Sequence, residues 1–477
     1  MTIPVPALIT KPWLHGLDLV RGVLGAVSWG PALSVSKAVV TSLFSQITVG
    51  QIEILIEETG ETMIYGQKII LDRPEVFNIK NNTNETNRCF LRVPKVKLIV
   101  KRGSFWLRLL LFGDIGFAEA YMLGDFECSD LVTFFEIFIK NRERLANATT
   151  ITSSIAATLT SLARSTNTLS NSLLNISAHY DISNEMFAAF LSEDMTYSCP
   201  IWKPVVGADM KEDLKSAQMT KLNRIIREAK IKNTDHVLEI GTGWGSFAIE
   251  AVSKTGCRVT SLTLSTEQKK LAEMRIAAAG YQDRITVLLM DYRAVPIPKV
   301  PFDKIVSIEM LEAVGKEYLE TYFSCIHKLL KKDGIAVFQC ITMPEGRYDD
   351  YAKGEDFIRK YIFPGGHLPS INQLITNISK GSEGTLVVER IDNIGGHYAK
   401  TLRLWKEEFL KNFDSHIKPA LLAKSENMDE IEIEVFRKKW EYYFVYCEAG
   451  FATKTLGDVI ITVGREGAME LMEGIPR

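Results

Sequence analysis

The pattern of apolar and polar positions divides the chain into two halves of different character. Between residues 47 and 118, short apolar runs such as "ITVGQIEILIEE", "ETMIYG", "VKLIVKRG" and "FWLRLLLFG" are separated by Gly, Pro and Asn-rich stretches, a pattern typical of strands and turns. The stretch "EAYMLGDFECSDLVTFFEIFI" predicts a helical pair. The residues that follow are rich in Ser, Thr, Asn and Ala, and we interpret 146–178 as a linker.

From about Asp235, apolar runs alternate with amphipathic ones. The runs "HVLEIG", "CRVTSLTL", "RITVLLMD", "FDKIVSIEM" and "GIAVFQCIT" predict strands, and helices are predicted between them. This alternation favours a mostly parallel sheet covered on both faces, which is a doubly wound α/β fold. The sequence therefore predicts an α+β N-terminal domain over 1–145 and a second domain over 179–477.

Composition and charge argue against nucleic-acid binding and favour a cytoplasmic setting. The chain has 477 residues, 46% of them hydrophobic, and a net charge of -2, so no global field would hold a nucleic acid. Seven cysteines without paired short spacings favour reduced thiols in a cytoplasmic setting, and no zinc pattern appears. We predict no transmembrane helix. The segment from Trp13 to Phe44 has two interpretations, a membrane-surface helix or a helix packed on its own domain.

Glycines 241, 243 and 245 in "VLEIGTGWGSFAIE" follow a predicted strand and open a helix, where a backbone without Cβ atoms lets a ligand approach closely. A dinucleotide fingerprint would have glycine instead of Ser246, and no acidic residue ends the next strand, so nicotinamide is disfavoured. A tight turn that binds no ligand is the alternative. The neighbouring polar turn has an alternative too, because Ser265 and Gln268 have the spacing of a helix capping box.

The order of Glu239, the three glycines, the polar turn and Asp291 resembles the S-adenosylmethionine pocket of class I methyltransferases. The cofactor-binding residues that this resemblance implies are Tyr197, Ser198, Glu239, Gly241, Gly243, Gly245, Thr263, Leu264, Gln268, Asp291 and Tyr292.

Further motifs make the resemblance more specific. These are "HYDISNEMFAAFLSEDMTYSCPIW", "SIEMLEAVG", "YIFPGGHLPS" and "GGHYAKTLRLW". Together with the glycine turn they closely resemble cyclopropane-fatty-acyl-phospholipid synthases and the related mycolic acid cyclopropane synthases, over residues 179–470. The N-terminal half resembles the small extra domain of the phospholipid-acting members, and "VFQCITMPEGRYDDY" is most similar to the plant and fungal branch.

This resemblance implies that the methyl carbon of S-adenosylmethionine is added across a cis double bond of an unsaturated phospholipid, with bound bicarbonate as the proton acceptor. The implied bicarbonate ligands are the side chain of Glu312, the hydroxyl of Tyr398, and the backbone at Cys199 and Ile341. Gln339 stands where bacterial members have a histidine. Because the double bond of such a substrate lies inside the bilayer, we expect the enzyme to bind a membrane surface without spanning it. The N-terminal domain is a candidate for membrane docking or for contact in a homodimer.

Several alternatives stay open at this stage. Glu309 falls where the family commonly has glycine and is interpreted as solvated or locally paired, and Glu312 has the alternative of an ordinary helix-start carboxylate. His367 and His397 could contribute to the anion site or be structural. The alternative functions are methylation of a lipid alkene to a methyl-branched or methylene product, and a noncatalytic lipid-binding protein on a methyltransferase fold.

Overall fold

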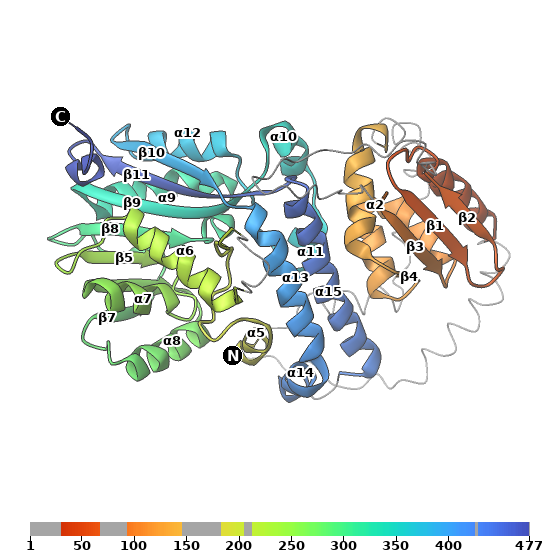
Figure 1. Cartoon of the computed structure of the whole chain (residues 1–477), viewed down its shortest axis with the longest axis horizontal. Coiled ribbons are helices and arrows are strands. Elements are labelled where there is room, and N and C mark those ends of the chain that lie inside the picture. Colours follow the sequence, from red (N-terminus) through yellow and green to blue (C-terminus); the bar gives the residue numbers. More distant parts are fainter. Residues whose placement is uncertain (1–29, 67–92, 146–182, 205–211, 425–427, 477) are drawn as a thin grey trace, which may run out of the picture. The chain divides into compact units, whose positions relative to one another are not determined.

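The computed structural model describes residues 30–66, 93–145, 183–204, 212–424 and 428–476 (Figure 1). The chain divides into two compact units, residues 1–170 and 171–477. The division falls inside the stretch predicted as a linker, all of which lies outside the described residues. The predicted bounds of the domains therefore stay predictions.

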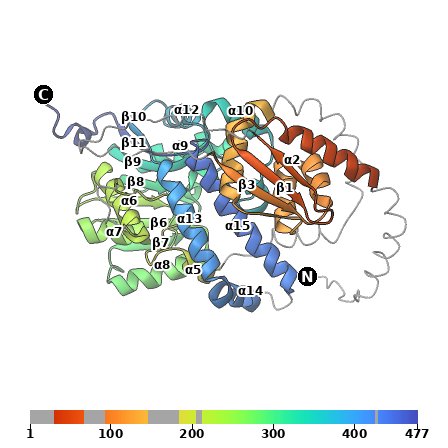
Figure 2. The same ribbon diagram turned by 45° about the vertical axis from the view of Figure 1, so that its right-hand side comes forward.

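The N-terminal unit contains a four-stranded sheet in the order β2-β1-β3-β4, of which Figure 2 labels β1 and β3. β1 pairs in parallel with β3, and the other two pairings are antiparallel. The predicted strands in this half are present, except for the last run. The strands are β1 (Gln51–Ile56), β2 (Thr62–Tyr65), β3 (Lys95–Val100) and β4 (Phe126–Cys128).

The run "FWLRLLLFG" was predicted as a strand, and this prediction is wrong, because it forms the first half of the helix α2 (Ser104–Met122). Leucine and arginine are good helix formers, and a short apolar run alone does not separate a buried strand from a buried helix. The helix is interrupted at Gly113, whose φ of 56° and ψ of -124° are not helical. Phe105 and Phe117, on either side of this kink, both contact the ring of Phe126 on β4.

Two further helices complete this unit, over residues 30–44 and 131–145. Val40 and Phe44 are buried, and the Phe44 ring contacts Tyr65 and Phe138 at 5.7 Å between centroids. The described part of the segment from Trp13 to Phe44 therefore packs on its own domain, while Trp13 itself lies outside the described residues. Within the described ranges, no helix is long and apolar enough to cross a bilayer.

The second unit is built on a seven-stranded sheet in the order β10-β11-β9-β8-β5-β6-β7 (Figure 1). β7, β6, β5, β8 and β9 pair in parallel, whereas β11 is antiparallel to both of its neighbours. All five strands predicted from the pattern are found. The strands are β5 (His236–Ile240), β6 (Arg258–Thr263), β7 (Ile285–Leu289), β8 (Phe302–Ile308), β9 (Leu330–Thr342), β10 (Leu386–Asn393) and β11 (Gly457–Arg465).

Helices flank this sheet and supply the rest of the core. Side chains of α9 and α12, among them Phe323 and Leu374, form one buried cluster with strand residues such as Leu238 and Phe338. The longer helices are α6 (Leu214–Glu228), α7 (Ser246–Thr255), α8 (Thr266–Ala279), α9 (Leu319–Leu329), α12 (Ile371–Gly381), α13 (Gly396–Lys411) and α15 (Glu430–Ala452). Shorter ones are α5 (Asn184–Phe190), α10 (Glu345–Lys353), α11 (Phe357–Tyr361), α14 (Lys418–Lys424), the π-helix η4 (Phe413–Ile417) and the 3-10 turns η1 (Tyr292–Ala294), η2 (Leu311–Ala313), η3 (Lys316–Tyr318) and η5 (Met469–Met472).

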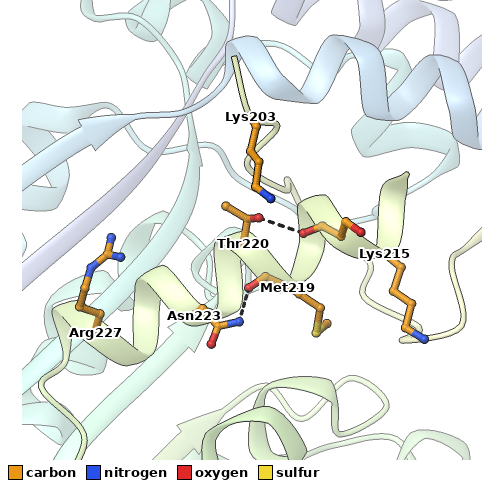
Figure 3. A pocket seen from close by; sticks show the side chains of 7 residues that line it. Lys203, Lys215, Met219, Thr220, Asn223 and Arg227 are labelled. Atoms are coloured by element: carbon orange, nitrogen blue, oxygen red, sulfur yellow. Dashed lines mark hydrogen bonds between the residues drawn. The ribbon is translucent and has the colours of Figure 1, made fainter. Parts of the chain in front are cut away.

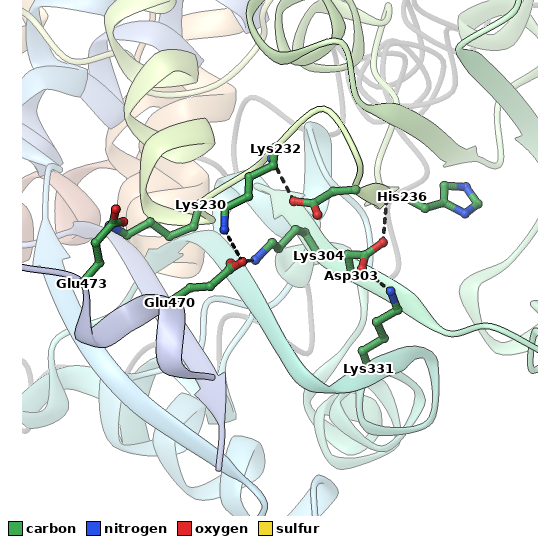
Figure 4. A network of polar contacts seen from close by, with 9 residues as sticks. Lys230, Lys232, His236, Asp303, Lys304, Lys331, Glu470 and Glu473 are labelled. Atoms are coloured by element: carbon green, nitrogen blue, oxygen red, sulfur yellow. Dashed lines mark hydrogen bonds and ion pairs between the residues drawn. The ribbon is translucent and has the colours of Figure 1, made fainter. Parts of the chain in front are cut away.

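A polar network fixes the amino ends of β5 and β8 (Figure 4). Lys304, only 3% exposed, forms an ion pair with Glu470 of η5, which also accepts from Lys232 at 2.6 Å. Asp303 accepts the backbone N–H of His236 at 2.7 Å and pairs with Lys331. Charged side chains therefore bond to one another at this edge of the sheet, and the opposite, carboxyl edge carries the candidate site.

Candidate functional site

The carboxyl ends of β5 and β8 meet at the point where the strand order reverses, which is where open α/β sheets form their ligand crevice. The glycine turn follows β5. Its three glycines have φ values of 103°, 51° and 86°, a left-handed region that favours glycine. A Cβ placed on Gly243 would meet no other atom within 4 Å, whereas one on Gly241 would lie 3.4 Å from Met310 after β8. The turn therefore leaves space that a bound ligand can fill.

Glu239, the last acidic residue before this turn, is only 3% exposed. The hydroxyl of Ser261 donates to its Oε2 at 2.5 Å and lies 2.7 Å from the hydroxyl of Thr242. Burial raises the pKa of Glu239 to about 8. The side chain is therefore held in its neutral form at pH 7, inside the wall of the glycine turn.

The predicted residues after β6 are arranged differently from a full capping box. The backbone N–H of Gln268 donates to the Ser265 hydroxyl at 3.1 Å, as a cap requires, but the side-chain Oε1 of Gln268 accepts from Thr263 at 2.9 Å. The predicted capping box is therefore only half formed. Leu264 at this strand end is 74% exposed, so it offers an apolar surface beside the crevice.

The predicted residues after β7 form a compact turn. Asp291 accepts from the backbone N–H of Arg293 at 2.8 Å and from its guanidinium at 2.6 Å. The ring of Tyr292 packs edge-on against Tyr322, with centroids 5.0 Å apart. Nine of the predicted cofactor-binding residues thus lie at the ends of three neighbouring strands, β5, β6 and β7, at the same edge of the sheet. The other two, Tyr197 and Ser198, come from the loop before α6, where the Tyr197 hydroxyl lies 2.8 Å from that of Tyr443 and the Ser198 hydroxyl accepts from Lys221 at 2.6 Å.

The most densely bonded group at this edge is the carboxylate of Glu309, directly after β8. Its Oε1 accepts from the backbone N–H of Cys199 at 2.7 Å and from Nε2 of Gln339 at 2.9 Å. Its Oε2 accepts from the hydroxyl of Tyr398 at 2.8 Å. Glu309 was predicted to be solvated or locally paired. Neither alternative describes it, because its partners lie 30 to 110 residues away in the chain.

These contacts bear directly on the predicted bicarbonate site. Three of its predicted ligands, Cys199, Gln339 and Tyr398, all donate to Glu309. The other predicted backbone donor, the N–H of Ile341, donates to Oε1 of Glu312 at 2.5 Å. Because protein carboxylates already occupy the donors, the residues of this chain do not fit a bound bicarbonate.

Glu309 also has an unusual backbone, with a φ of 47°. A residue that carries a Cβ pays about 1–2 kcal/mol to adopt this left-handed region, whereas glycine does not. The carboxylate is therefore kept at a position that local backbone energetics would give to glycine. Such strain persists only where the surrounding structure fixes it.

Asp458, on β11, is a second carboxyl group in this cluster and was not predicted. Gln339 Nε2 donates to its Oδ2 at 3.0 Å, and Asp458 shares a further hydrogen bond with Glu309. Burial and the charge of Glu309 hold the pKa of Asp458 well above its usual range. Burial also raises the pKa of Glu309, but the hydrogen bond from Asp458 and the Cys199 N–H counteract the rise. Together with the three donors to Glu309, the directions of these shifts favour the proton on Asp458 and the ionised form of Glu309.

Lys221, on the buried face of α6, supplies the positive charge. Its Nζ donates to the hydroxyl of Ser198 at 2.6 Å, and the side chain is fully buried. Burial lowers the pKa of Lys221, while the charge of Glu309 opposes this shift. The attraction between the buried ammonium and the charge of Glu309 reduces the cost of placing either group in the interior, although no direct ion pair joins Lys221 to a carboxylate of the described residues.

Glu312 is the third carboxyl group of the cluster. Burial, and next the charge of Glu309, raise the pKa of Glu312 to about 8, so it is mostly neutral at pH 7. Its Oε2 is buried and has no hydrogen-bond partner among the described residues. The alternative of an ordinary helix-start carboxylate does not fit well, because the side chain bonds to the β9 backbone at Ile341 and lies in the interior.

Aromatic rings form a wall next to the carboxyl cluster. Tyr197 lies 5.0 Å from Trp405 between ring centroids, and its hydroxyl is 2.8 Å from that of Tyr443. Tyr398 stacks on Phe451 at 4.6 Å. Tyr398 belongs to both groups, because its ring packs in this wall and its hydroxyl donates to Glu309.

The two histidines have structural partners. His397 Nδ1 accepts from the backbone N–H of Trp202 at 3.2 Å, and His367 Nε2 lies 3.0 Å from the hydroxyl of Tyr348. Among the hydrogen bonds of the described residues, neither histidine side chain bonds to Glu309 or Glu312. The alternative that they are structural is therefore favoured.

The sequence held signals for the two residues that were missed. Asp458 is a charged residue in the otherwise apolar run "LGDVIITVG", where an unpaired acid would be costly. Lys221 shares a helix face with Ala217 and Ile225, both buried. A charge at an expected core position indicates a buried partner, although it does not identify that partner.

A separate cavity of about 530 Å³ lies along the outer face of α6, lined by Lys203, Lys215, Ser216, Met219, Thr220, Asn223 and Arg227 (Figure 3). Several lining side chains are already bonded within this helix, such as Thr220 to the Ser216 carbonyl at 2.9 Å. Lys221 is buried on the other side of the same helix. This cavity is therefore not part of the carboxyl cluster.

Two curated proteins are similar to most of this chain. The tuberculostearic acid methyltransferase UfaA1 of Mycobacterium tuberculosis is 36% identical over 364 residues, which cover 74% of this chain and 80% of that protein. The cyclopropane-fatty-acyl-phospholipid synthase of Escherichia coli is 33% identical over 378 residues, with 78% and 89% covered.

Among solved structures, the mycolic acid cyclopropane synthase CmaA1 complexed with SAH and CTAB is 29% identical and has a TM-score of 0.51. The similarity covers 61% of this chain and 98% of CmaA1, so the second unit has a class I methyltransferase fold. A family profile described as "Mycolic acid cyclopropane synthetase" matches residues 167–460. The chain therefore belongs to the mycolic acid cyclopropane synthetase family.

Proposed function

We propose that this protein transfers the methyl carbon of S-adenosylmethionine to a cis double bond of a phospholipid acyl chain and so forms a cyclopropane ring. The observation that carries the proposal is the position of the Glu309 carboxylate. It accepts from the hydroxyl of Tyr398, whose ring contacts Trp405, and the next residue, Met310, packs against Gly241 of the glycine turn. A proton acceptor in an apolar, aromatic site is what the loss of a proton from a carbocation requires.

The glycine turn fits a bound S-adenosylmethionine, because the left-handed glycines and the open space at Gly243 leave room for a ligand against the backbone. When bound, this cofactor supplies an activated methyl carbon on its sulfonium. Thr263, Leu264 and Tyr292 lie at the strand ends that follow and would contact its adenosine, as in related methyltransferases. The SAH in the CmaA1 structure supports this assignment.

The chemistry sets two demands on the residues around the site. An alkene is a weak nucleophile, so it must be held in line with the methyl carbon in a site from which water is excluded. Methyl transfer then leaves a positive charge on the lipid. The faces of Tyr197, Tyr398 and Trp405 can stabilise this positive charge without forming a bond to the cation, whereas water would react with it.

An acyl chain must leave a membrane to reach such a site, so we infer that the enzyme works at a membrane surface. The cyclopropane-fatty-acyl-phospholipid synthase among the relatives supports a phospholipid as the substrate. A role of the N-terminal domain in membrane docking or in a homodimer belongs to the same proposal.

A second candidate is methylation of the alkene to a methylene or methyl-branched product, with a different fate of the cation. It is favoured by the relative named tuberculostearic acid methyltransferase, and by Gln339 at the family's histidine position. The alternative of a noncatalytic lipid-binding protein is disfavoured by the buried, fully bonded Glu309.

The experiment that tests the proposal incubates the full chain with methyl-labelled S-adenosylmethionine and vesicles of oleoyl phospholipid. We expect labelled lipid with a cyclopropane ring, identified by NMR because a methylene isomer has the same mass. A methylene signal would favour the second candidate. Binding of SAH by calorimetry without transfer to any lipid would contradict both.

A further inference from the structure

Glu309 brings a negatively charged group of the protein to the place predicted for a bound anion. Its two oxygens accept from the Cys199 N–H, the Gln339 amide and the Tyr398 hydroxyl, at 2.7 to 2.9 Å. The resemblance implied the Cys199 N–H and the Tyr398 hydroxyl as ligands of bicarbonate, and Gln339 stands at the position of the histidine that contacts bicarbonate in bacterial members. The same donor geometry therefore serves a carboxylate that is part of the chain.

We propose that the Glu309 carboxylate is the built-in proton acceptor of the reaction and that the enzyme needs no bicarbonate. This inference rests on the proposed function, since it identifies the group that accepts the proton in that reaction. The carboxylate is a chemical analogue of bicarbonate, with two oxygens on a planar carbon and a single negative charge. Covalent attachment to β8 makes its local concentration independent of the solution.

The electrostatic surroundings match this role. Lys221 is a fully buried cation that interacts electrostatically with both Glu309 and Asp458. Asp458 retains a proton and shares it with Glu309, and Glu312 is held neutral beside them. One negative and one positive charge therefore balance, and a bicarbonate would bring a further negative charge that has no partner.

The proton transfer balances in atoms and electrons. The alkene forms a bond to the methyl carbon while the sulfur keeps the electron pair of the bond that breaks, which leaves a neutral thioether and a lipid cation. A C–H bond of the transferred methyl group then breaks, its electron pair closes the ring, and the proton forms an O–H bond on Glu309. The carboxylic acid later releases this proton to solvent.

The decisive variant is Glu309→Gly. Glycine adopts the φ of 47° without strain, so the backbone is expected to fold as before, with the three donors exposed to the site. A matched control is Glu383→Gly, because Glu383 has a similar φ of 55° but is exposed on a turn after α12. Thermal unfolding shows whether both variants remain folded. The turnover measured with Glu383→Gly shows whether relief of backbone strain alone changes the activity.

We expect wild-type turnover to be the same in carbonate-free buffer as in added bicarbonate. Glu309→Gly should lose about a hundredfold or more in turnover, the usual contribution of a positioned base, while it keeps its affinity for SAH. Added bicarbonate or formate should restore part of the rate. Glu383→Gly should keep the wild-type rate.

A binding experiment gives a second readout that does not depend on turnover. Isotope-labelled bicarbonate, followed by NMR, should bind Glu309→Gly and not the wild-type protein. The inference is overturned if wild-type turnover requires bicarbonate, if the wild type binds it at this site, or if Glu309→Gly is fully active without any added anion. By contrast, a wild type that binds SAH but modifies no lipid overturns the proposed function, and the bicarbonate titration still reports on Glu309.

Discussion

The ammonium group of Lys221 donates to the hydroxyl of Ser198 across 2.6 Å, in an interior region that also holds three carboxyl groups. Lys221→Met removes the positive charge and keeps the length of the side chain. A buried carboxylate without its counter-charge costs about 3–5 kcal/mol, so we expect a fall of this size in the free energy of unfolding at pH 7. Urea titration measures this change.

The control for this variant is Lys215→Met on the same helix. Lys215 is exposed and pairs only with an exposed carboxylate of Glu193, so its loss should leave the urea midpoint unchanged. Unchanged stability in Lys221→Met would show that the cluster does not depend on this charge.

The Tyr398 hydroxyl can be removed without loss of its ring contacts. Tyr398→Phe keeps the stacking on Phe451 and deletes one of the donors to Glu309. A hydrogen bond to a charged group contributes about 1.5–3 kcal/mol, so we expect turnover to fall about 10- to 100-fold. Calorimetry with SAH should give an unchanged affinity, and an unchanged turnover would contradict the assigned contact.

Glu312→Gln distinguishes two candidate proton acceptors, the Glu309 carboxylate and a bound bicarbonate. Because the pKa of Glu312 is raised to about 8, this residue is mostly neutral at pH 7, and glutamine can still accept the Ile341 N–H. We therefore expect a much smaller loss of turnover than in Glu309→Gln, and the loss of any step near pH 8 in the pH–rate profile. A loss as large as that of Glu309→Gln would favour a bicarbonate that needs Glu312.

Gly243→Val should prevent binding of S-adenosylmethionine. The valine side chain would project into the open space beside the turn, and the φ of 51° is unfavourable for a branched residue. Isothermal titration with SAH is expected to show a loss of affinity of about a hundredfold or more, equivalent to roughly 3 kcal/mol. Gly280→Val at the end of α8, with a φ of 76° and open space around it, is the control for backbone strain and should still bind.

Glu239 should make the stability of the ligand-free protein depend on pH. Its pKa is raised from 4.5 to about 8 in the folded state, so the folded protein holds this proton more tightly than the unfolded chain. The contribution of Glu239 to the free energy of unfolding is therefore fully present below pH 4.5 and is lost as the pH rises to about 8. The expected loss is up to roughly 4 kcal/mol. Urea midpoints of Glu239→Gln should depend less on pH in this window, and parallel curves would contradict the assignment.

The sequence predicted the parallel strands and the glycine turn because both depend on local patterns. Strands buried on both faces are continuous apolar runs, and the three glycines lie next to one another in the chain. The first half of the helix Ser104–Met122 was wrongly predicted as a strand, because a short leucine-rich run fits either a strand or a helix. Gln268 has the spacing of a capping box, but the nearby Thr263 hydroxyl competes for its side chain.

The environment of Glu309 could not be predicted in the same way. Its donors come from a loop at Cys199, from β9 at Gln339 and from α13 at Tyr398, so the site exists only after the second unit has folded. A carboxylate in an apolar run indicated that something unusual was present. It did not indicate whether the partner was an ion or the protein itself.

The position of β11 has a consequence for synthesis of the protein. This strand inserts between β9 and β10 although it follows both in the chain, and it carries Asp458. A nascent chain that has not yet extruded β11 holds Glu309 without the acid that shares its proton. The carboxyl cluster is therefore completed only when β11 has joined the sheet.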